Sequence, residues 1–201
     1  MAKRLNLTIR QGETFTRIIR WETLPYVYKA ITGVTQAAPV AITAVGHGLK
    51  TGWRTAVVSV KGMKEINAEH VPPRDSDYNQ VTVVDVDTVT LNKVNSADFG
   101  AYISGGYLQF YTPVDLTGYS ARMDIKDRIG GTVLLPLTSG APDNRIVLNA
   151  AENTITVTIT AVDTAALDFT KGVYDLELVA PTMAVTTIYS GTVTITKEVT
   201  A

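Results

Sequence analysis

The sequence predicts an all-β protein: an antiparallel β-sandwich domain, discontinuous in the chain, with a small β-barrel module inserted into it. The first observation is composition, since 29 Thr, 24 Val and 14 Ile account for 67 of the 201 residues. Such β-branched side chains favour a pleated sheet. The second is alternation of apolar and polar residues near the C-terminus, and the third is a central stretch with turn signals of its own.

The first elements are two strands at residues 5–10 and 14–21, with Gln11-Gly12-Glu13 between them. Glycine adopts turn conformations that other residues resist, so we expect these strands to form a hairpin. The hairpin also supplies the best candidate for a partner-binding edge. Its first strand alternates, lacks proline and follows a basic arm that we expect to be free to reach a neighbouring protein. The candidate residues of this edge are Lys3, Arg4, Leu5, Leu7 and Ile9.

The residue composition changes after Trp21, where Leu24-Pro25 interrupts the strand pattern. Residues 30–106 are rich in Gly, Val and Ala, and we expect them to form the inserted β-barrel module. The outer β-sandwich domain then consists of residues 1–29 and 107–201. The predicted strands of the module are residues 40–44, 55–60, 80–84 and 89–91, separated by the turn signals Gly46-His47-Gly48, Lys61-Gly62, Pro72-Pro73 and Gly105-Gly106.

After Pro113 the pattern returns to strands, first in residues 114–123 and then near the C-terminus. Alternation there predicts three antiparallel strands with one buried face. The side chains expected to point into the core are Ile155, Val157, Ile159, Tyr174, Leu176, Leu178, Val193 and Ile195. Between the first two of these strands, Thr160 and Asp163 form a capping-box pattern that predicts a short helical turn ending near Leu167.

Charge and cysteine content exclude several classes of function. The 18 Lys and Arg residues balance 19 Asp and Glu residues, so no broad positive field favours nucleic acid as the main partner. There is no cysteine, which excludes disulfides and thiolate chemistry. The N-terminal residues lack the apolar run of a secretion signal, and no segment has the length and apolarity of a membrane span. We therefore expect a soluble protein without a membrane partner.

Several segments resemble small structural proteins of tailed bacteriophages and prophages. They are Gln11-Gly12-Glu13-Thr14-Phe15, residues 115–123, residues 155–167, Tyr174-Asp175-Leu176-Glu177-Leu178 and Gly191-Thr192-Val193-Thr194-Ile195. That family is similar to the N-terminal domain of lactococcal phage upper-baseplate proteins, which anchors receptor-binding machinery to the tail. The central stretch resembles a phage-tail β-barrel module named after the first catalytic-cysteine half-domain of ubiquitin-activating enzymes. Its segments are residues 31–39, Gly46-His47-Gly48-Leu49, residues 62–67 and Tyr102-Ile103-Ser104-Gly105-Gly106.

The resemblance implies a non-enzymatic virion protein, assembled in the host cytoplasm, that binds other tail, baseplate or connector proteins in several copies of a symmetric assembly. Ubiquitin-like activation is excluded because the chain has no cysteine. Two alternatives remain open: a carbohydrate-binding receptor module of the tail, and a decoration protein that clamps capsid subunits. Copy number per particle separates the structural and decoration functions, and saturable binding to a host glycan identifies the receptor module.

Residue patterns for catalysis and cofactor binding are weak, and we expect neither an enzyme nor a cofactor. His47 lies between two glycines, where a histidine commonly bonds its own loop, and His70 has no recognised metal-ligand spacing. Asp75-Ser76-Asp77 begins like a calcium loop, but Gln80 and Val86 occupy the positions of the required glycine and glutamate. A looser calcium site helped by Asp85 or Asp87 is the alternative to a solvated polar loop.

Aromatic residues at the two borders of the inserted module give a second candidate binding surface. Tyr26 and Tyr28 are two residues apart on one side, and Tyr107 and Tyr111 lie on the other. If both segments are extended, they pair as a two-stranded stalk on which the tyrosines meet. Such a cluster packs between modules, stacks on sugars or anchors a partner protein.

Overall fold

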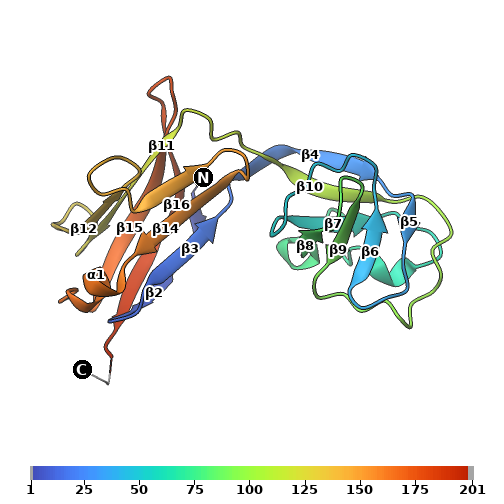
Figure 1. Cartoon of the computed structure of the whole chain (residues 1–201), viewed down its shortest axis with the longest axis horizontal. Coiled ribbons are helices and arrows are strands. Elements are labelled where there is room, and N and C mark those ends of the chain that lie inside the picture. Colours follow the sequence, from blue (N-terminus) through green and yellow to red (C-terminus); the bar gives the residue numbers. More distant parts are fainter. Residues whose placement is uncertain (1, 199–201) are drawn as a thin grey trace. The chain divides into compact units, whose positions relative to one another are not determined.

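The computed structural model describes residues 2–198, and the chain divides into two compact units. Unit 1 is made of the chain up to Trp21 and from Val114 onward, and unit 2 is Glu22–Pro113. β-strands are the main regular secondary structure of both units, so the predicted all-β fold class is confirmed (Figure 1). Among the described residues, no helix is long and apolar enough to cross a membrane.

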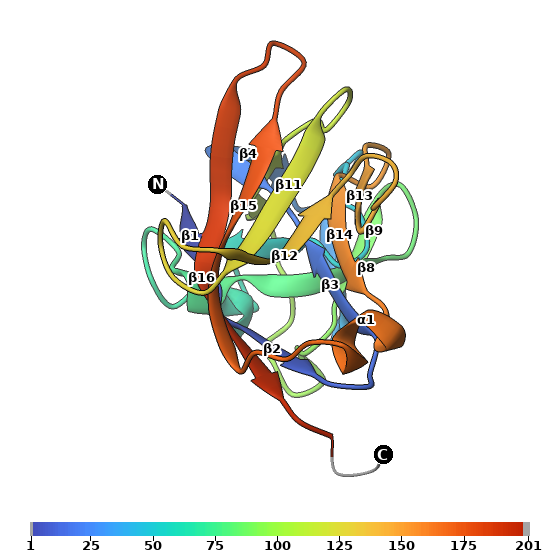
Figure 2. The same ribbon diagram turned by 90° about the vertical axis from the view of Figure 1, so that its left-hand side faces the viewer.

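Unit 1 contains two sheets that share one hydrophobic core, and both can be followed in Figure 2. The larger sheet has the strand order β1 (Lys3–Arg4), β16 (Val185–Thr196), β15 (Lys171–Val179), β11 (Ser120–Lys126) and β12 (Val133–Thr138), with β2 (Leu7–Arg10) also paired to β16. The smaller sheet has the order β13 (Ile146–Asn149), β14 (Thr154–Ile159) and β3 (Phe15–Ile19).

The alternation in the three C-terminal strands sets which side chains fill this core. All the side chains predicted to point inward are buried there, and the predicted strands are confirmed; they are Ile155, Val157, Ile159, Tyr174, Leu176, Leu178, Val193 and Ile195. Threonines occupy the opposite face of β14. Strands β12 and β13 were not predicted, because Pro136 interrupts the first and the second is only four residues long.

The predicted N-terminal hairpin is wrong. β2 pairs with β16 in parallel, and β3 pairs with β14 in the other sheet, so the turn at residues 11–13 crosses from one sheet to the other. The physical reason is burial: Leu7 and Ile9 on β2 and Ile19 on β3 all fill the core between the sheets. With β2 and β3 in facing sheets, both strands bury apolar side chains between the sheets, which is more apolar surface than a hairpin with one solvent-exposed face would bury.

A short helix, α1 (Ala161–Ala165), follows β14 as predicted. The Thr160 hydroxyl accepts a hydrogen bond from the amide of Asp163 (3.2 Å) and donates one to the Asp163 carboxylate (2.8 Å). This satisfies an amide that the first helical turn leaves without a partner.

Unit 2 is one seven-stranded sheet wrapped around its own core, which contains the buried Trp53. The strand order is β4 (Glu22–Ala30), β10 (Tyr107–Pro113), β7 (Arg54–Val58), β8 (Asn79–Val83), β9 (Thr88–Leu91), β6 (Val40–Thr43) and β5 (Gly33–Val34). The two ends of this order, β4 and β5, are joined in the chain by Ile31 and Thr32 alone. The sheet therefore curves back on itself as a half-barrel, and all four strands predicted for the module are present.

The borders between the units differ from the predicted ones. Strands β4 and β10 were assigned to the outer domain, but they pair with each other and β10 also pairs with β7. Leu108 and Phe110 of β10 are buried in the core of unit 2. The predicted stalk therefore belongs to the inserted unit, because its apolar side chains have their partners there.

Candidate functional site

The four predicted tyrosines come together on β4 and β10, as expected for paired extended segments. Tyr26 lies directly opposite Tyr111, with ring centroids 4.8 Å apart, and the two hydroxyl groups share a hydrogen bond of 3.3 Å. Tyr28 meets Tyr107 edge to face at 6.2 Å. Tyr28 and Tyr107 remain 53% and 45% exposed as residues, so this end of the row is available for contact.

Two further residues complete this surface, and sequence reasoning missed both. Arg54, at the start of β7, lies over the rings of Tyr78 and Tyr111, at 5.1 and 5.7 Å from their centroids. The guanidinium group also pairs with Glu22 (2.7 Å) and Asp75 (3.2 Å). The only sequence signal was an arginine directly before a predicted strand, and pairing across strands that are distant in sequence brings these residues together. We call Tyr26, Tyr28, Tyr78, Tyr107, Tyr111 and Arg54 the tyrosine surface.

Two phenols of the tyrosine surface, those of Tyr78 and Tyr111, have raised pKa values. The hydrogen bond with Tyr26, followed by burial, raises the pKa of Tyr111 to about 12. Burial is the main cause that raises the pKa of Tyr78, although its hydroxyl accepts a hydrogen bond from the Gln109 amide at 3.2 Å. A neutral phenol next to a paired arginine suits stacking and hydrogen bonding rather than proton transfer at neutral pH.

The N-terminal candidates do not form a free arm. Lys3 and Arg4 pair in parallel with Tyr189 and Ser190 of β16, and the amide of Leu5 donates to the carbonyl of Ser190 at 2.9 Å. Gly191 permits this approach, because a β-carbon there would clash with the carbonyl oxygen of Leu5. The chain therefore docks on its own sheet.

Leu7 and Ile9 are also not surface residues, since they are 7% and 0% exposed in the core of unit 1. They contact the interior of their own unit and present no apolar side chain to a partner. Only Lys3 and Arg4 among the five N-terminal candidates have exposed side chains.

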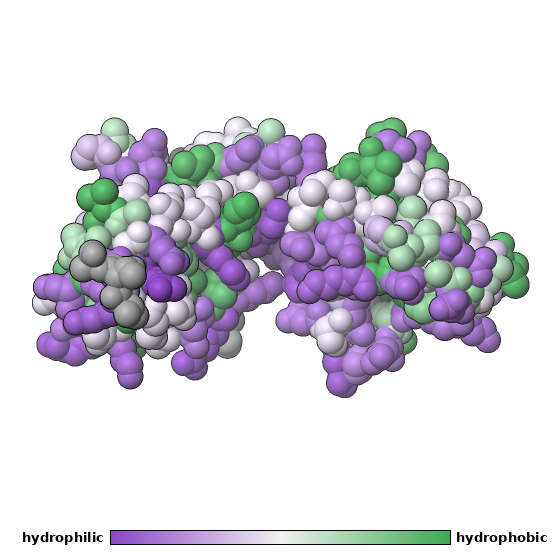
Figure 3. Space-filling view, turned by 60° about the horizontal axis from the view of Figure 1, so that its bottom comes forward, coloured by the Kyte–Doolittle hydropathy of each residue, from purple (hydrophilic) through white to green (hydrophobic). Residues whose placement is uncertain are grey.

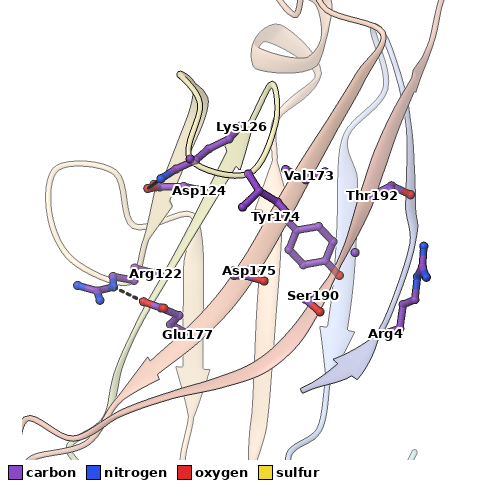
Figure 4. A pocket seen from close by; sticks show the side chains of 13 residues that line it. Arg4, Arg122, Asp124, Lys126, Val173, Tyr174, Asp175, Glu177, Ser190 and Thr192 are labelled. Carbon is purple, nitrogen blue, oxygen red and sulfur yellow. Dashed lines mark hydrogen bonds and ion pairs between the residues drawn. The ribbon is translucent and has the colours of Figure 1, made fainter. Parts of the chain in front are cut away.

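A groove of ≈ 710 Å³ lies on the solvent face of the larger sheet of unit 1 (Figure 4). Arg4, Ser190, Asp175 and Asp124 form a row across four neighbouring strands. The next row holds the Arg122–Glu177 ion pair at 2.6 Å. The groove carries both signs of charge in an exposed setting, which suits a polar contact with another chain rather than enclosure of a substrate.

His47 contacts its own loop and the turn between β8 and β9, and His70 contacts its own loop. His47 is buried, its Nδ1 accepts the amide of Leu49 (3.0 Å), and its Nε2 lies 3.1 Å from the carbonyl of Asp85. His70 meets Asp77 at 3.1 Å, a carboxylate contact that the sequence did not predict.

The acidic residues considered for calcium are held by protein groups. The carboxylate of Asp77 accepts hydrogen bonds from the amides of Arg74 (2.7 Å) and Glu69 (3.2 Å). The Arg74 amide is the main cause that lowers the pKa of Asp77. Glu69, His70 and Asp77 bring their ligand atoms within 4.8 Å of one another. Asp75, however, pairs with Arg54, so the two aspartates of the loop serve separate structural interactions.

Comparison with protein-family models and with curated proteins finds no match. The fold and surfaces define the class: an all-β protein of two units, with an aromatic and arginine-containing surface on unit 2 and a charged groove on unit 1.

Proposed function

We propose that this chain is a non-enzymatic structural protein of a tailed-bacteriophage particle that binds other tail, baseplate or connector proteins. The observation that carries the proposal is the nested arrangement, in which a β unit with its own core, Glu22–Pro113, interrupts a β-sandwich unit. The resemblance of the sequence to phage structural proteins implies that order of modules. The surfaces on both units are of a kind that contacts proteins.

The role of the titratable groups also supports binding over catalysis. Arg54 pairs with Glu22 and Asp75, His70 pairs with Asp77, and the His47 ring nitrogens face backbone groups of its own unit. These interactions stabilise loops and strands. A protein that works by holding partners requires this rigidity.

Quantitative mass spectrometry of purified particles tests the proposal. Particles released from cells that carry this chain are separated into heads and tails, and peptides of the chain are counted against the major capsid and tail proteins. We expect to find the chain in the tail fraction, with a copy number per particle that is a whole multiple of the rotational symmetry of the tail. Absence from purified particles contradicts the proposal, and a copy number near that of the major capsid protein identifies a decoration protein instead.

A second function, glycan binding in a receptor module, is favoured by one observation. The exposed rings of Tyr28 and Tyr107 stand at 90° to each other with centroids 6.2 Å apart, and tyrosine faces stack on the apolar faces of sugars. In that case the isolated protein binds host surface polysaccharide saturably, and Tyr107→Ala weakens binding about ten-fold, the effect of losing one stacked ring of about 1.4 kcal/mol. Ile103→Ala, at a 75% exposed apolar position of the same unit, is the matched control.

A further inference from the structure

Strand β4 leaves one side of its backbone open. It is nine residues long and ends the strand order of the seven-stranded sheet, where β10 is its only partner among the described strands. Apolar residues are exposed along it, including Leu24 at 64% and Tyr28 at 53%. A long edge strand with exposed apolar side chains is a template for a strand from another chain.

The direction of the free backbone groups follows from the antiparallel alternation. Ile31 donates its amide hydrogen to Gly106, at 3.0 Å, on the β10 side. Every second residue then bonds to β10, which assigns Lys29 and Val27 to that side. The amides and carbonyls of Tyr26, Tyr28 and Ala30 therefore point away from β10.

On the open side of β4, the next residue along the chain with an amide facing this way already donates it to another strand. The amide of Thr32 points in the same direction as those of Tyr28 and Ala30, and it donates to the carbonyl of Thr43 in β6 at 2.9 Å. β6 ends at Thr43. Within residues 2–198, no strand takes its place beside Tyr26, Tyr28 and Ala30.

The charge of Lys29 decides which occupant fits. Lys29 lies opposite Leu108, on the core-facing side of the sheet, where it is half-buried at the open edge. The structure shows no ion pair or hydrogen bond of the Lys29 side chain among the described residues. A second copy of β4 paired about Tyr28 would bring the two Lys29 ammonium groups diagonally across the new pair, which repels self-association.

We propose that the open edge of β4 binds an extended segment of a different protein that carries a carboxylate opposite Lys29 and apolar side chains against Tyr26 and Tyr28. The main-chain hydrogen bonds are made to Tyr26, Tyr28 and Ala30, and the Lys29–carboxylate pair selects the segment. This inference rests on the proposed function in requiring a protein partner, and it names the surface and the chemistry of that partner.

Nuclear magnetic resonance titration of the full chain with a blocked peptide, Thr-Ser-Glu-Val-Thr-Val-Ser, tests the site. Its glutamate pairs with Lys29 when the peptide runs antiparallel to β4. We expect saturable amide shifts at millimolar peptide, largest for Tyr26, Tyr28 and Ala30. The same peptide with lysine in place of glutamate binds about five-fold more weakly, because it loses an ion pair worth about 1 kcal/mol. The absence of saturable shifts, or equal binding of both peptides, overturns the proposal.

Two variants separate the site from general effects on folding. Tyr28→Pro removes an amide that points to the open side and none that bonds β10, so the fold persists while binding is lost. Lys29→Glu reverses the preference between the two peptides, a result that misfolding does not produce. A variant pair without these effects overturns the proposal.

Analytical sedimentation of the free chain tests whether a second copy of the same chain occupies the edge of β4. A dimer that Tyr28→Pro dissociates shows that a second copy occupies the edge and overturns the choice of a different protein. The proposed virion function is tested by a different experiment. If the chain is absent from particles but the peptide still binds β4, only the virion function is contradicted.

Discussion

Neighbouring residues on β15 have opposite environments. Leu176 is fully buried in the core of unit 1, whereas Glu177 points to solvent and pairs with Arg122, whose side chain is 59% exposed. Leu176→Asp places an unpaired carboxylate in the core, and we expect it to lower the free energy of unfolding by several kcal/mol. Glu177→Gln removes an exposed ion pair and should cost about 0.5 kcal/mol. Denaturant titration of both variants measures this difference, and equal losses contradict the inward assignment of Leu176.

Tyr174 makes the stability of unit 1 depend on pH. Its hydroxyl donates to the carbonyl of Leu5 at 2.7 Å, and burial is the main cause that raises its pKa to about 12. In the unfolded chain a tyrosine ionises near pH 10. Because the folded state holds this proton more tightly, the contribution of Tyr174 is fully present below about pH 10 and is lost as pH rises to about 12.

Tyr174→Phe tests this dependence. At neutral pH the variant should lose about 1 kcal/mol with the hydrogen bond to Leu5. Its unfolding free energy should then fall less steeply than that of the wild type above pH 10. Denaturant unfolding at a series of alkaline pH values provides the measurement, and parallel pH profiles of the two proteins count against the role of Tyr174.

At the scale of secondary-structure elements, the effect of a proline in strand β2 depends on whether the amide that it removes points toward β16 or away from it. The amides of Leu5 and Gln11 donate to β16, at 2.9 Å each. By alternation the amide of Leu7 points the same way, and that of Thr8 points away from the sheet.

Leu7→Pro should therefore destabilise unit 1 by about 3 kcal/mol or more, since it removes a ladder hydrogen bond and a buried side chain. Thr8→Pro keeps both and should cost much less. Thermal unfolding followed by circular dichroism compares the two. If Thr8→Pro proves as damaging as Leu7→Pro, the parallel pairing of β2 with β16 is wrong.

At the scale of the whole molecule, the two borders of unit 2 lie where the sandwich strands stop and resume. The amide of Val114 donates to the carbonyl of Trp21 at 3.0 Å, so the ends left after removal of Glu22–Pro113 are adjacent within unit 1. A short Gly-Ser linker of about four residues can join them as a hairpin connection.

Replacing residues 22–113 with that linker should give a folded β-protein that unfolds cooperatively. Replacing only residues 30–106 retains most of β4 and β10 without the strand β7 and exposes Phe110, so this product should aggregate. Limited proteolysis and calorimetry of both proteins provide the readout. A protease-sensitive product from the first deletion rules out an independently folding outer unit.

Local patterns predicted the parts of this protein that local chemistry determines. Period-two alternation identified β14, β15 and β16 and their buried faces, the Thr160–Asp163 pattern identified α1, and the spacing of tyrosines at the module borders predicted the pairing of β4 with β10. In the first two cases the residues are close in sequence or follow a regular repeat. Tyr26 and Tyr111 are 85 residues apart, and their positions at the two borders of the module were the signal for that pairing.

Tertiary structure decided which strands become neighbours, because that choice depends on how much apolar surface distant segments bury together. It placed β2 and β3 in different sheets, docked Lys3 and Arg4 on β16, and brought Arg54 and Tyr78 to the predicted tyrosines. It also shows that, of β4 and the predicted N-terminal strand, β4 is the one whose open edge carries exposed apolar side chains. Alternation alone shows that a strand has two edges, and only the finished sheet shows which edge is left without a partner.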